Sequence, residues 1–592
     1  MSDSPLPRLE AVIDTAAVTR SIEARLPVGV RPRQLRVRTL LVGMLLTAVH
    51  GRPAHLTRIH QALLSLPETD QHRLGVITQW ATGPHLLTYR QLERTFGLLT
   101  RALSKPEPDG TPSEQLSHVL DALLEASVQV LGEPDNSSYT VDWTDLETWS
   151  RPPPKPRASH NSTNTDHSTT TSTADSSSTA DSSSTADSTT TSTADSSSTS
   201  TSTSDSSTST SDSSTSTSDS STSTSDSTSS TGSSGGGGGD DGVRRCADPE
   251  AAWGHRNSNH PARNELFYGY YLQAITSVRD EHGPEVPELA RRMQLAACDH
   301  DPPAQVLPVI KRMVSDGITI TDLLADSGYA YRIPTTWALP LRAHGIALVQ
   351  DLHPADRGPN GTHKGATSAN GNLYCPATPK ALLELGPLPP SANNEQTATH
   401  DQQSAELAKY KLSAISAYDS DGYRRVKCPA AQGKIRCPHR PASMTLNYNR
   451  PTIQTPPEHP PACCTQQTIT VPPTVNAKTA QKHDYPSAAH RSSYQRRTAA
   501  ERTFAQINDP ATNTLARGNH RIMGLTAIAL LTATTIIARN IRIHDAFTAR
   551  QTDNHRRANL GLPSKQRKRR RHTPQHPAAT ANAPPQPDAH TA

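Results

Sequence analysis

The sequence has few of the residues that build hydrophobic cores. Of its 592 residues, 33% are hydrophobic and 4% are aromatic, whereas proline occurs 49 times. A chain of this composition cannot bury enough apolar surface along its whole length to offset the entropy lost on folding. We therefore expect a folded mass of about 350 to 420 residues, with the remainder in linkers and tails.

Cysteine is also scarce, and apolar runs are short. The seven cysteines show no regular framework and no signal-peptide pattern precedes them, which predicts a cytoplasmic rather than a disulfide-stapled secreted protein. Leu40 to Val49 is too short to span a bilayer, and Ile522 to Ala538 is at the lower limit of length. The threonines of the second run and the arginines that follow it favour a helix buried on a sheet. We expect no membrane association.

Positive charge is absent from residues 158–242. This segment contains eleven aspartates, no lysine or arginine, and otherwise mostly Ser, Thr and Gly in short repeats. We expect a disordered acidic linker, which is either a phosphorylatable or DNA-mimicking tether or a loop expansion that the fold tolerates. Removing its eleven negative charges from the net charge of +4 leaves +15 for the rest of the chain, which suits a polyanionic partner.

The N-terminal region, residues 1–130, combines helical periodicity with many arginines. Apolar residues at helical spacing occupy 35–49 and 56–66, and glycine and proline interrupt them. The arginines around these runs are Arg31, Arg33, Arg36, Arg38, Arg52 and Arg58. The pattern predicts a basic helical domain, which acts either as a helix-turn-helix DNA reader or as a dimerisation or packing unit.

An aspartate follows a strand-like segment at two places. Ser138 to Asp142 has strand composition, and we prefer Asp142 to Asp145 as a site residue because we expect Asp145 in the following turn. Leu323 to Ala325 is a short apolar run that Asp326 ends. Such an aspartate either lines a site at the carboxyl edge of a sheet or only caps a turn.

A third carboxylate lies on an expected helix from Tyr494 to Asn508. At about 100° per residue, a polar and an apolar stripe run side by side along it. The polar stripe contains Tyr494, Arg497, Glu501 and Asn508, and the apolar stripe contains Ala500, Phe504 and Ile507. Docking by the apolar stripe would hold the arginine and the glutamate at the edge of a core. Taken alone, the pattern also fits a solvated helix with an i, i+4 ion pair.

The spacing of this helix resembles a known family. Tyr494, Arg497 and Glu501 are spaced as in the Y-x2-R-x3-E-x6-K pattern of DDE transposases of bacterial insertion sequences, in which the Glu is the third catalytic carboxylate. Asn508 stands where that pattern has lysine, so a cation for phosphate contact is missing. The run Asp326-Ser327-Gly328-Tyr329 resembles the second catalytic Asp of the family with its Gly-Tyr companion, and Asp142 resembles the first.

The resemblance implies an enzyme that cleaves DNA and transfers the cut strand at the ends of a mobile element. Asp142, Asp326 and Glu501 would be catalytic and would bind two divalent ions, Mg²⁺ or Mn²⁺. Tyr494 and Arg497 would contact DNA, as would position 508. The partners would be double-stranded DNA, namely the terminal repeats and the target. The family further implies a homodimer in the DNA complex and a cytoplasmic, nucleoid-associated location.

The expected fold is an RNase H-like α/β core with a mixed sheet flanked by helices. In chain order we expect a helical DNA-binding domain (1–130), the first part of the core (131–157), the linker (158–242), the continued core (243–352), an insertion with cysteines (353–487), the C-terminal core helices (488–548) and a disordered basic tail (549–592).

The insertion and the tail carry further candidate residues. The insertion contains Cys375, Cys428, Cys437, Cys463 and Cys464, which either bind a structural Zn²⁺ or are buried thiols, since they lack paired C-x2-C spacing. The tail contains Lys565, Arg567, Lys568, Arg569, Arg570 and Arg571, which either attract DNA phosphates or serve solubility. Two alternatives to an active transposase are a catalytically impaired remnant that only binds DNA and an RNase H-like nuclease.

Overall fold

The computed structural model describes most of the chain outside the acidic linker. The described residues are 4–27, 33–104, 114–153, 246–256, 265–512 and 515–565. They form a mixed α/β structure with a helical N-terminal region and a six-stranded mixed sheet. The expected linker, residues 158–242, and the basic residues Arg567, Lys568, Arg569, Arg570 and Arg571 lie outside the described residues.

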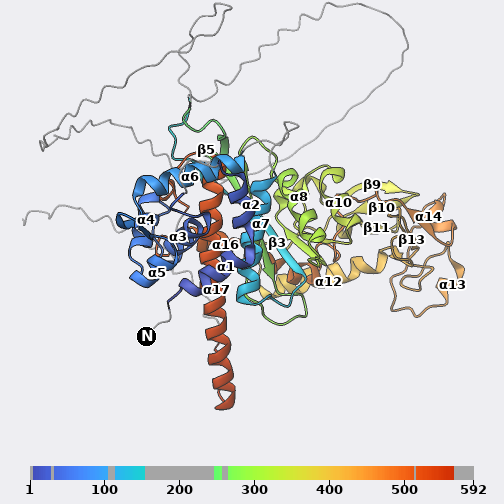
Figure 1. Cartoon of the computed structure of the whole chain (residues 1–592). Coiled ribbons are helices and arrows are strands. Elements are labelled where there is room, and N and C mark those ends of the chain that lie inside the picture. The colour runs from blue at the N-terminus through green and yellow to red at the C-terminus, as the bar shows by residue number, and fades with distance from the viewer. Residues whose placement is uncertain are drawn as a thin grey trace, which may run out of the picture. The chain divides into compact units, whose positions relative to one another are not determined.

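The N-terminal region is helical, as its periodicity predicts. Its helices are α1 (Leu6–Ala16), α2 (Val18–Arg25), α3 (Val37–Val49), α4 (Leu56–Leu64), α5 (Glu68–Arg73), α6 (Tyr89–Ser104) and α7 (Gln115–Leu131). Apolar residues occupy every side of α3, so it is buried along almost its whole length, with α1, α4 and α17 (Leu525–Asn559) packed around it (Figure 1). The hairpin of β1 (Ile77–Trp80) and β2 (Gly83–Leu86) was not predicted, because four-residue strands give too little alternation to detect.

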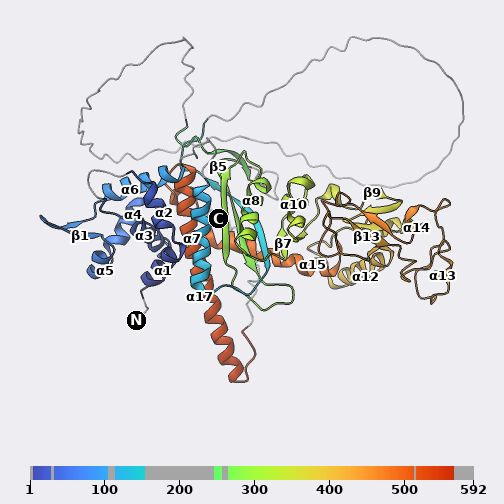
Figure 2. The same cartoon turned by 45° about the vertical axis from the view of Figure 1, so that its right-hand side comes forward.

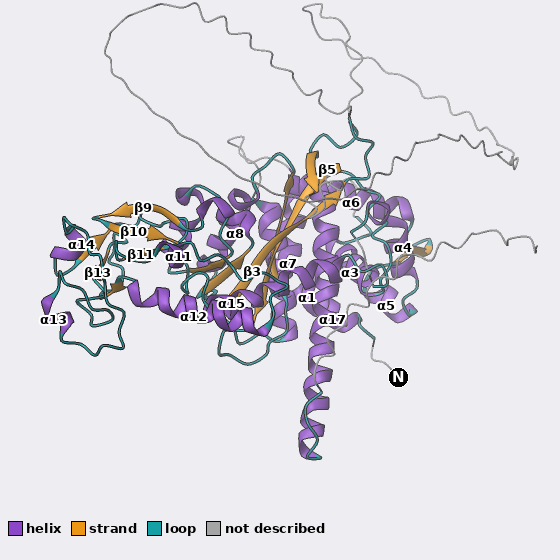
Figure 3. Cartoon of the chain, turned by 180° about the vertical axis from the view of Figure 1, so that it is seen from behind, coloured by secondary structure: helices purple, strands orange, loops and turns teal. Residues whose placement is uncertain are grey.

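A six-stranded mixed sheet forms the centre of the fold (Figure 3). Its strands are β3 (Ser138–Glu147), β4 (Ala252–Arg256), β5 (Glu265–Val278), β6 (Ala290–Ala297), β7 (Asp322–Ala325) and β8 (Ala347–Gln350). β5 runs antiparallel to β3 on one side, and on its other side it pairs antiparallel with β4 and β6 in succession. β7 lies parallel to β3, and β8 lies parallel to β7. The strand order is therefore β6, β5, β3, β7, β8, with β4 beside the first part of β5.

The strand that carries Asp142 is longer than predicted. We expected it to end at Asp142, but β3 continues to Glu147 because β5 pairs with it along its entire length. Asp145 therefore lies on the strand and not in a turn. The predicted strand at 323–325 is present as β7, and β8 lies beside it.

Helices cover both faces of the sheet. On one face, α8 (Pro302–Ser315), α9 (Ser327–Ala330) and α10 (Ala338–Ala343) share a core with Ile275 and Ala325. On the other face, Ala274 lies in the core that includes α7 and α17, and Leu324 packs with Ala499 of α16 (Thr498–Ile507). Neighbouring residues of β5 and β7 thus alternate between the two cores, as side chains of a strand do.

The apolar run at 522–538 is part of α17, which spans 35 residues. Among the described helices only α17 has the length and composition of a membrane span, yet 89% of its apolar 18-residue window is buried inside the protein. The run is thus a buried helix, as predicted. The expectation of a disordered tail from residue 549 is wrong for its first part, because no glycine or proline interrupts the helix before Gly561 and α17 continues to Asn559.

The region 353–487 contains small sheets and one long helix (Figure 2). Its elements are β9 (Pro359–His363), β10 (Ala366–Ala369), β11 (Asn372–Tyr374), α11 (Lys380–Leu383), α12 (Asn394–Tyr410), β12 (Ser413–Ala414), β13 (Arg424–Lys427), α13 (Pro441–Met444), α14 (Ala462–Thr465) and β14 (Ile469–Val471). The strands form two three-stranded sheets. No helix was predicted in this region, but the capping box of Asn393 and Gln396 is a sequence signal that marks the start of α12.

Candidate active site

Asp142 and Asp326 occupy equivalent positions on neighbouring strands. The parallel ladder between β3 and β7 ends with the pair Val141 and Ala325, so that each aspartate is the next residue. Parallel strands lie about 4.8 Å apart, which brings the two carboxylates to the same edge of the sheet. Asp326 ends β7 because its carboxylate accepts a hydrogen bond of 2.6 Å from the backbone N–H of Ser327, which starts α9.

Glu501 lies on α16 and is linked to Asp142 by hydrogen bonds from Arg497 to both carboxylates. The guanidinium of Arg497 donates to Asp142 Oδ2 at 3.3 Å and to Glu501 Oε1 at 2.5 Å. Arg497 and Asp142 are mostly buried, with side chains 15% and 16% exposed, whereas Glu501 is 55% exposed. The apolar stripe of α16 fixes this arrangement, because Ala500, Phe504 and Ile507 are buried as predicted.

The predicted helix is divided by a tighter turn. α15 (Ala488–Tyr494) is followed by a 3-10 turn at Gln495–Arg497 and then by α16. The helix predicted from Tyr494 to Asn508 is therefore not continuous, although the i, i+4 contact between Arg497 and Glu501 is retained. Asn508 ends α16 as an exposed residue at its carboxyl end.

The electrostatics of the site are those of clustered carboxylates around one cation. Burial raises the pKa of Asp142 to about 6, and the negative charges of Asp326 and Glu501 add to the rise while Arg497 opposes it. Burial tends to lower the pKa of Arg497, but Tyr494 and the three carboxylates raise it overall. Asp326 is thus close enough to act on both Asp142 and Arg497. All three predicted carboxylates belong to one electrostatic cluster.

Aromatic side chains surround the cluster. The guanidinium carbon of Arg497 lies 5.5 Å from the ring centroid of Tyr494, and burial raises the pKa of this tyrosine. Behind Asp142, the ring of Trp143 meets the ring of Tyr329 edge-on at 4.7 Å. Tyr329 is fully buried and donates a hydrogen bond of 3.1 Å to Gln273. The site therefore has an apolar, well-packed side.

Arg496 is a site-forming residue that the sequence did not reveal. It is buried, and its guanidinium donates to Asp322 at 2.5 Å and to Ser138 at 3.0 Å. Burial works to raise the pKa of Asp322, but the hydrogen bond from Ser138 and the charge of Arg496 lower it overall. This ion pair ties the 3-10 turn to the first residues of β3 and β7. It thereby fixes the backbone from which the neighbouring Arg497 reaches the carboxylates.

Two other residues that the sequence analysis considered lie away from the cluster. Asp145, the aspartate that we rejected, forms an ion pair of 2.7 Å with Arg256. Lys565 follows α17 and lies 3.8 Å from Asp553, with its side chain 72% exposed.

The cysteines of the insertion are buried in two cores. Cys375, Cys428 and Cys437 lie in one, and Cys463 and Cys464 lie in the other, with 3.9 Å between the last two sulfurs. Burial raises the pKa of Cys375 to about 12, which keeps it a neutral thiol. Among the described residues no group of three or more His, Cys, Asp or Glu is placed to hold a metal ion. The zinc site stays a prediction.

Among the described residues, Asp142, Asp326 and Glu501 likewise do not form a group placed to hold a metal ion. The donors of this carboxylate cluster suit Mg²⁺ or Mn²⁺, because these ions prefer carboxylate oxygens. In the arrangement described here, however, Arg497 lies between Asp142 and Glu501 as their counter-ion. The negative charge that a divalent cation would neutralise is thus partly matched by a guanidinium.

The chain matches no family model, no curated protein and no solved structure. The fold and the geometry of the carboxylate cluster are therefore the basis on which a function can be assigned.

Proposed function

We propose that the protein is a DDE-type transposase that cleaves DNA and transfers strands at the ends of a mobile element. The observation that carries the proposal is the convergence of Asp142, Asp326 and Glu501. These residues are separated by 184 and 175 positions, yet they share one electrostatic cluster around Arg497. Two carboxylates at the carboxyl edge of a sheet and a third from a helix are what the resemblance implies.

The strand order supports an RNase H-like core. Three strands that follow one another in the sheet, β6, β5 and β3, are antiparallel, and β7 and β8 then continue parallel to β3. Fold alone does not define an activity. The fold supports the proposed activity because Asp142 and Asp326 lie next to each other where the β3–β7 ladder ends.

In this proposal the residues of the chain have distinct roles. Asp142, Asp326 and Glu501 would hold two Mg²⁺ or Mn²⁺ ions, which supply Lewis acidity for phosphoryl transfer when bound. Arg497 keeps the acidic side chains together when cations are absent and offers bidentate donors to a phosphate. Tyr494 stacks on His490 and packs against the guanidinium of Arg497, so its ring helps to hold that arginine in place. The packed side formed by Trp143 and Tyr329 excludes water from behind Asp142.

The test is metal-dependent cleavage of duplex DNA that carries the sequences flanking the gene. We expect Asp326→Asn and Glu501→Gln to reduce cleavage by about 100-fold or more, because each removes a charged metal ligand while keeping the shape of the side chain. Asp145→Asn is the matched control, since it makes the same change on β3 away from the cluster. If the first two variants cut DNA as fast as the wild type, the assignment is wrong.

A second candidate function is a transposase remnant that binds DNA without cutting it. Two observations favour it: Arg497 already bridges two of the acids, and Asn508 stands where the resembled pattern has lysine. This alternative predicts DNA binding by the wild type without cleavage in either Mg²⁺ or Mn²⁺. The same assay therefore separates the two functions.

A further inference from the structure

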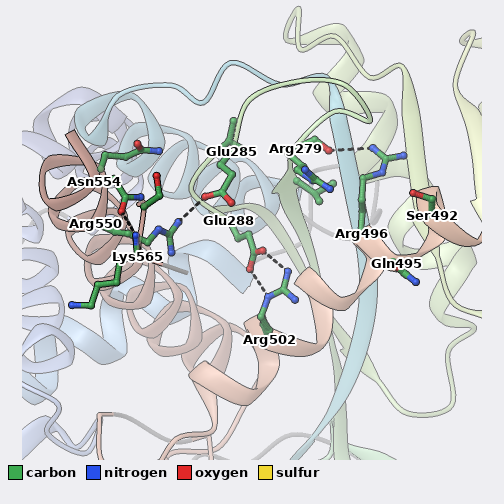
Figure 4. Close-up of a pocket in the computed structure, with 14 residues that line it drawn as sticks. Arg279, Glu285, Glu288, Ser492, Gln495, Arg496, Arg502, Arg550, Asn554 and Lys565 are labelled. Carbon is green, nitrogen blue, oxygen red and sulfur yellow. Dashed lines mark hydrogen bonds and ion pairs between the residues drawn. The ribbon is translucent and has the colours of Figure 1, made fainter. Parts of the chain in front are cut away.

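A cleft of about 770 Å³ lies beside α16 (Figure 4), and its lining does not include Asp142, Asp326 or Glu501. Its walls come from the loop after β5, from the turn before α16, from α16 itself and from the second half of α17. The charged lining residues are Arg279, Glu285, Glu288, Arg496, Arg502, Arg550 and Lys565. Five of these are cations and two are carboxylates.

The cations of the cleft are held in place in different ways. Arg502 is fixed by two bonds to Glu288, one of them 2.9 Å long, and by a bond of 2.7 Å to Thr498. Arg550 forms an ion pair of 3.3 Å with Glu285, whose side chain is 66% exposed, and its guanidinium carbon lies 5.3 Å from the ring centroid of Phe547. Arg279 is exposed, and within the described part of the chain its guanidinium has no hydrogen bond or ion pair.

The remaining side chains of the lining are mostly neutral donors. Ser492, Gln495, Gln551, Asn554 and Ser564 supply hydroxyl and amide groups. Hydroxyls, amides and guanidinium groups are the usual protein partners of phosphate oxygens in DNA complexes. Arg496 is paired with the buried Asp322 and Arg502 with Glu288, so the accessible positive groups of the cleft are Arg279, Arg550 and Lys565. These cations and the neutral donors match a phosphodiester backbone better than an apolar ligand.

The cleft and the carboxylate cluster use different sides of the same helix. Arg502 follows Glu501 directly, so its side chain leaves α16 about 100° away from that of Glu501. Gln495 and Arg496 belong to the 3-10 turn before α16 and also line the cleft. A molecule in the cleft would therefore lie next to the cluster without occupying it.

We propose that this cleft binds the phosphate backbone of duplex DNA outside the segment that is cut. The inference rests on the proposed function only in taking DNA as the partner. Sequence continuity supports it, because Ser564 and Lys565 line the cleft and Arg567 to Arg571 follow immediately in the chain. The cleft holds the duplex by charge and polar contacts, without reading its sequence.

The test compares DNA binding by the full-length protein with that of two double variants in EDTA, where no cleavage occurs. Arg279→Gln with Arg550→Gln should weaken binding to a duplex of arbitrary sequence and reduce the slope of log K against log salt by about two. Both side chains are at the surface, and a thermal melt confirms that the variant is folded. Lys380→Gln with Arg425→Gln removes two exposed charges from the insertion and should leave the slope nearly unchanged.

Three outcomes overturn the proposal. One is an unchanged slope in the cleft variant, and another is an equal loss in the insertion variant, which would mean that charge anywhere on the surface counts. The third is stabilisation of the wild type by inorganic phosphate that the cleft variant loses while its DNA binding stays the same, which would make the cleft a site for free phosphate. Because cleavage is not measured, failure of the proposed function appears only in the separate cleavage assay.

Discussion

At the scale of single residues, opposing effects act on the charge of Asp142. Burial and two neighbouring carboxylates disfavour its charged form, and Arg497 relieves only part of this cost. A buried acid with a raised pKa reduces stability at neutral pH, since folding then costs the free energy of keeping it ionised. Functional groups commonly carry such a cost, because the same charge is what binds cations or substrate.

Replacing Asp142 by Asn should therefore stabilise the metal-free protein at neutral pH. The pKa of Asp142 is about 6 when folded and 3.8 in its ordinary state, so the folded protein binds the proton more tightly and wild-type stability falls as pH rises between these values. The stability of the Asn variant does not fall with rising pH in this way, because asparagine does not ionise. Its free energy of unfolding should exceed that of the wild type by roughly 2 kcal/mol at about pH 7 and by little at about pH 4.

Urea unfolding in the presence of a chelator measures this difference. Asp145→Asn serves as the control, because its carboxylate is paired with Arg256 at the surface and should give no gain at neutral pH. A variant–wild-type difference that does not change with pH would show that Asp142 ionises normally in the folded protein.

At the scale of elements, a close contact between α9 and β3 sets the positions of the two aspartates. A Cβ atom at Gly328 would lie 2.3 Å from the ring of Trp143. Only glycine thus lets the start of α9 approach the strand that carries Asp142. This contact gives a physical reason for the glycine that follows Asp326 in the motif.

Gly328→Ala should lower stability by about 1 to 3 kcal/mol, because the rigid indole has to move to make room. The shift should also change the fluorescence of Trp143, and under the proposed function it should reduce cleavage, since Trp143 and Gly328 lie next to Asp142 and Asp326. Gly97→Ala makes the same change in α6, where the added methyl meets nothing within 4 Å. It should raise stability by about 0.5 to 1 kcal/mol. Equal effects of the two substitutions in thermal melts would contradict a steric role for Gly328.

At the scale of the whole molecule, the described residues before and after the acidic segment are in contact. The hydroxyl of Ser150 lies 3.1 Å from the sulfur of Cys246, and Thr148 donates to the buried Asp248 at 2.5 Å. The chain thus leaves the described structure near Pro153 and returns near Cys246 at almost the same point. A short connection can join these ends without strain.

Replacing residues 158–242 by about eight Gly and Ser residues should therefore leave the fold and the activity intact. Loop closure costs about 0.6 kcal/mol for each doubling of length, so the shorter connection should stabilise the protein by roughly 2 kcal/mol. Thermal unfolding and the cleavage assay measure the two effects. A large fall in melting temperature would show that the segment packs on the protein, and a loss of cleavage alone would show that it acts in the reaction.

Much of the secondary structure near the site could be predicted because it depends on local pattern. The apolar run before Asp326, the strand before Asp142 and the apolar stripe of α16 each follow from residues close in sequence. The pairing of Arg497 with Glu501 is local as well, since four residues span one helical turn. The break between α15 and α16 was missed, because it depends on the buried ion pair of Arg496.

The sequence by itself determined which carboxylates were candidates, and it placed Asp142 on a strand and Glu501 on a helix. Only the tertiary structure decided which of them come together. It brings Asp142 into the cluster and pairs Asp145 with Arg256, and it buries Arg496 against Asp322 while Arg497 faces the acids. Arg496 and Arg497 are identical neighbours in the sequence. Their roles differ because burial and charge pairing are set by residues up to 358 positions away, which no local pattern records.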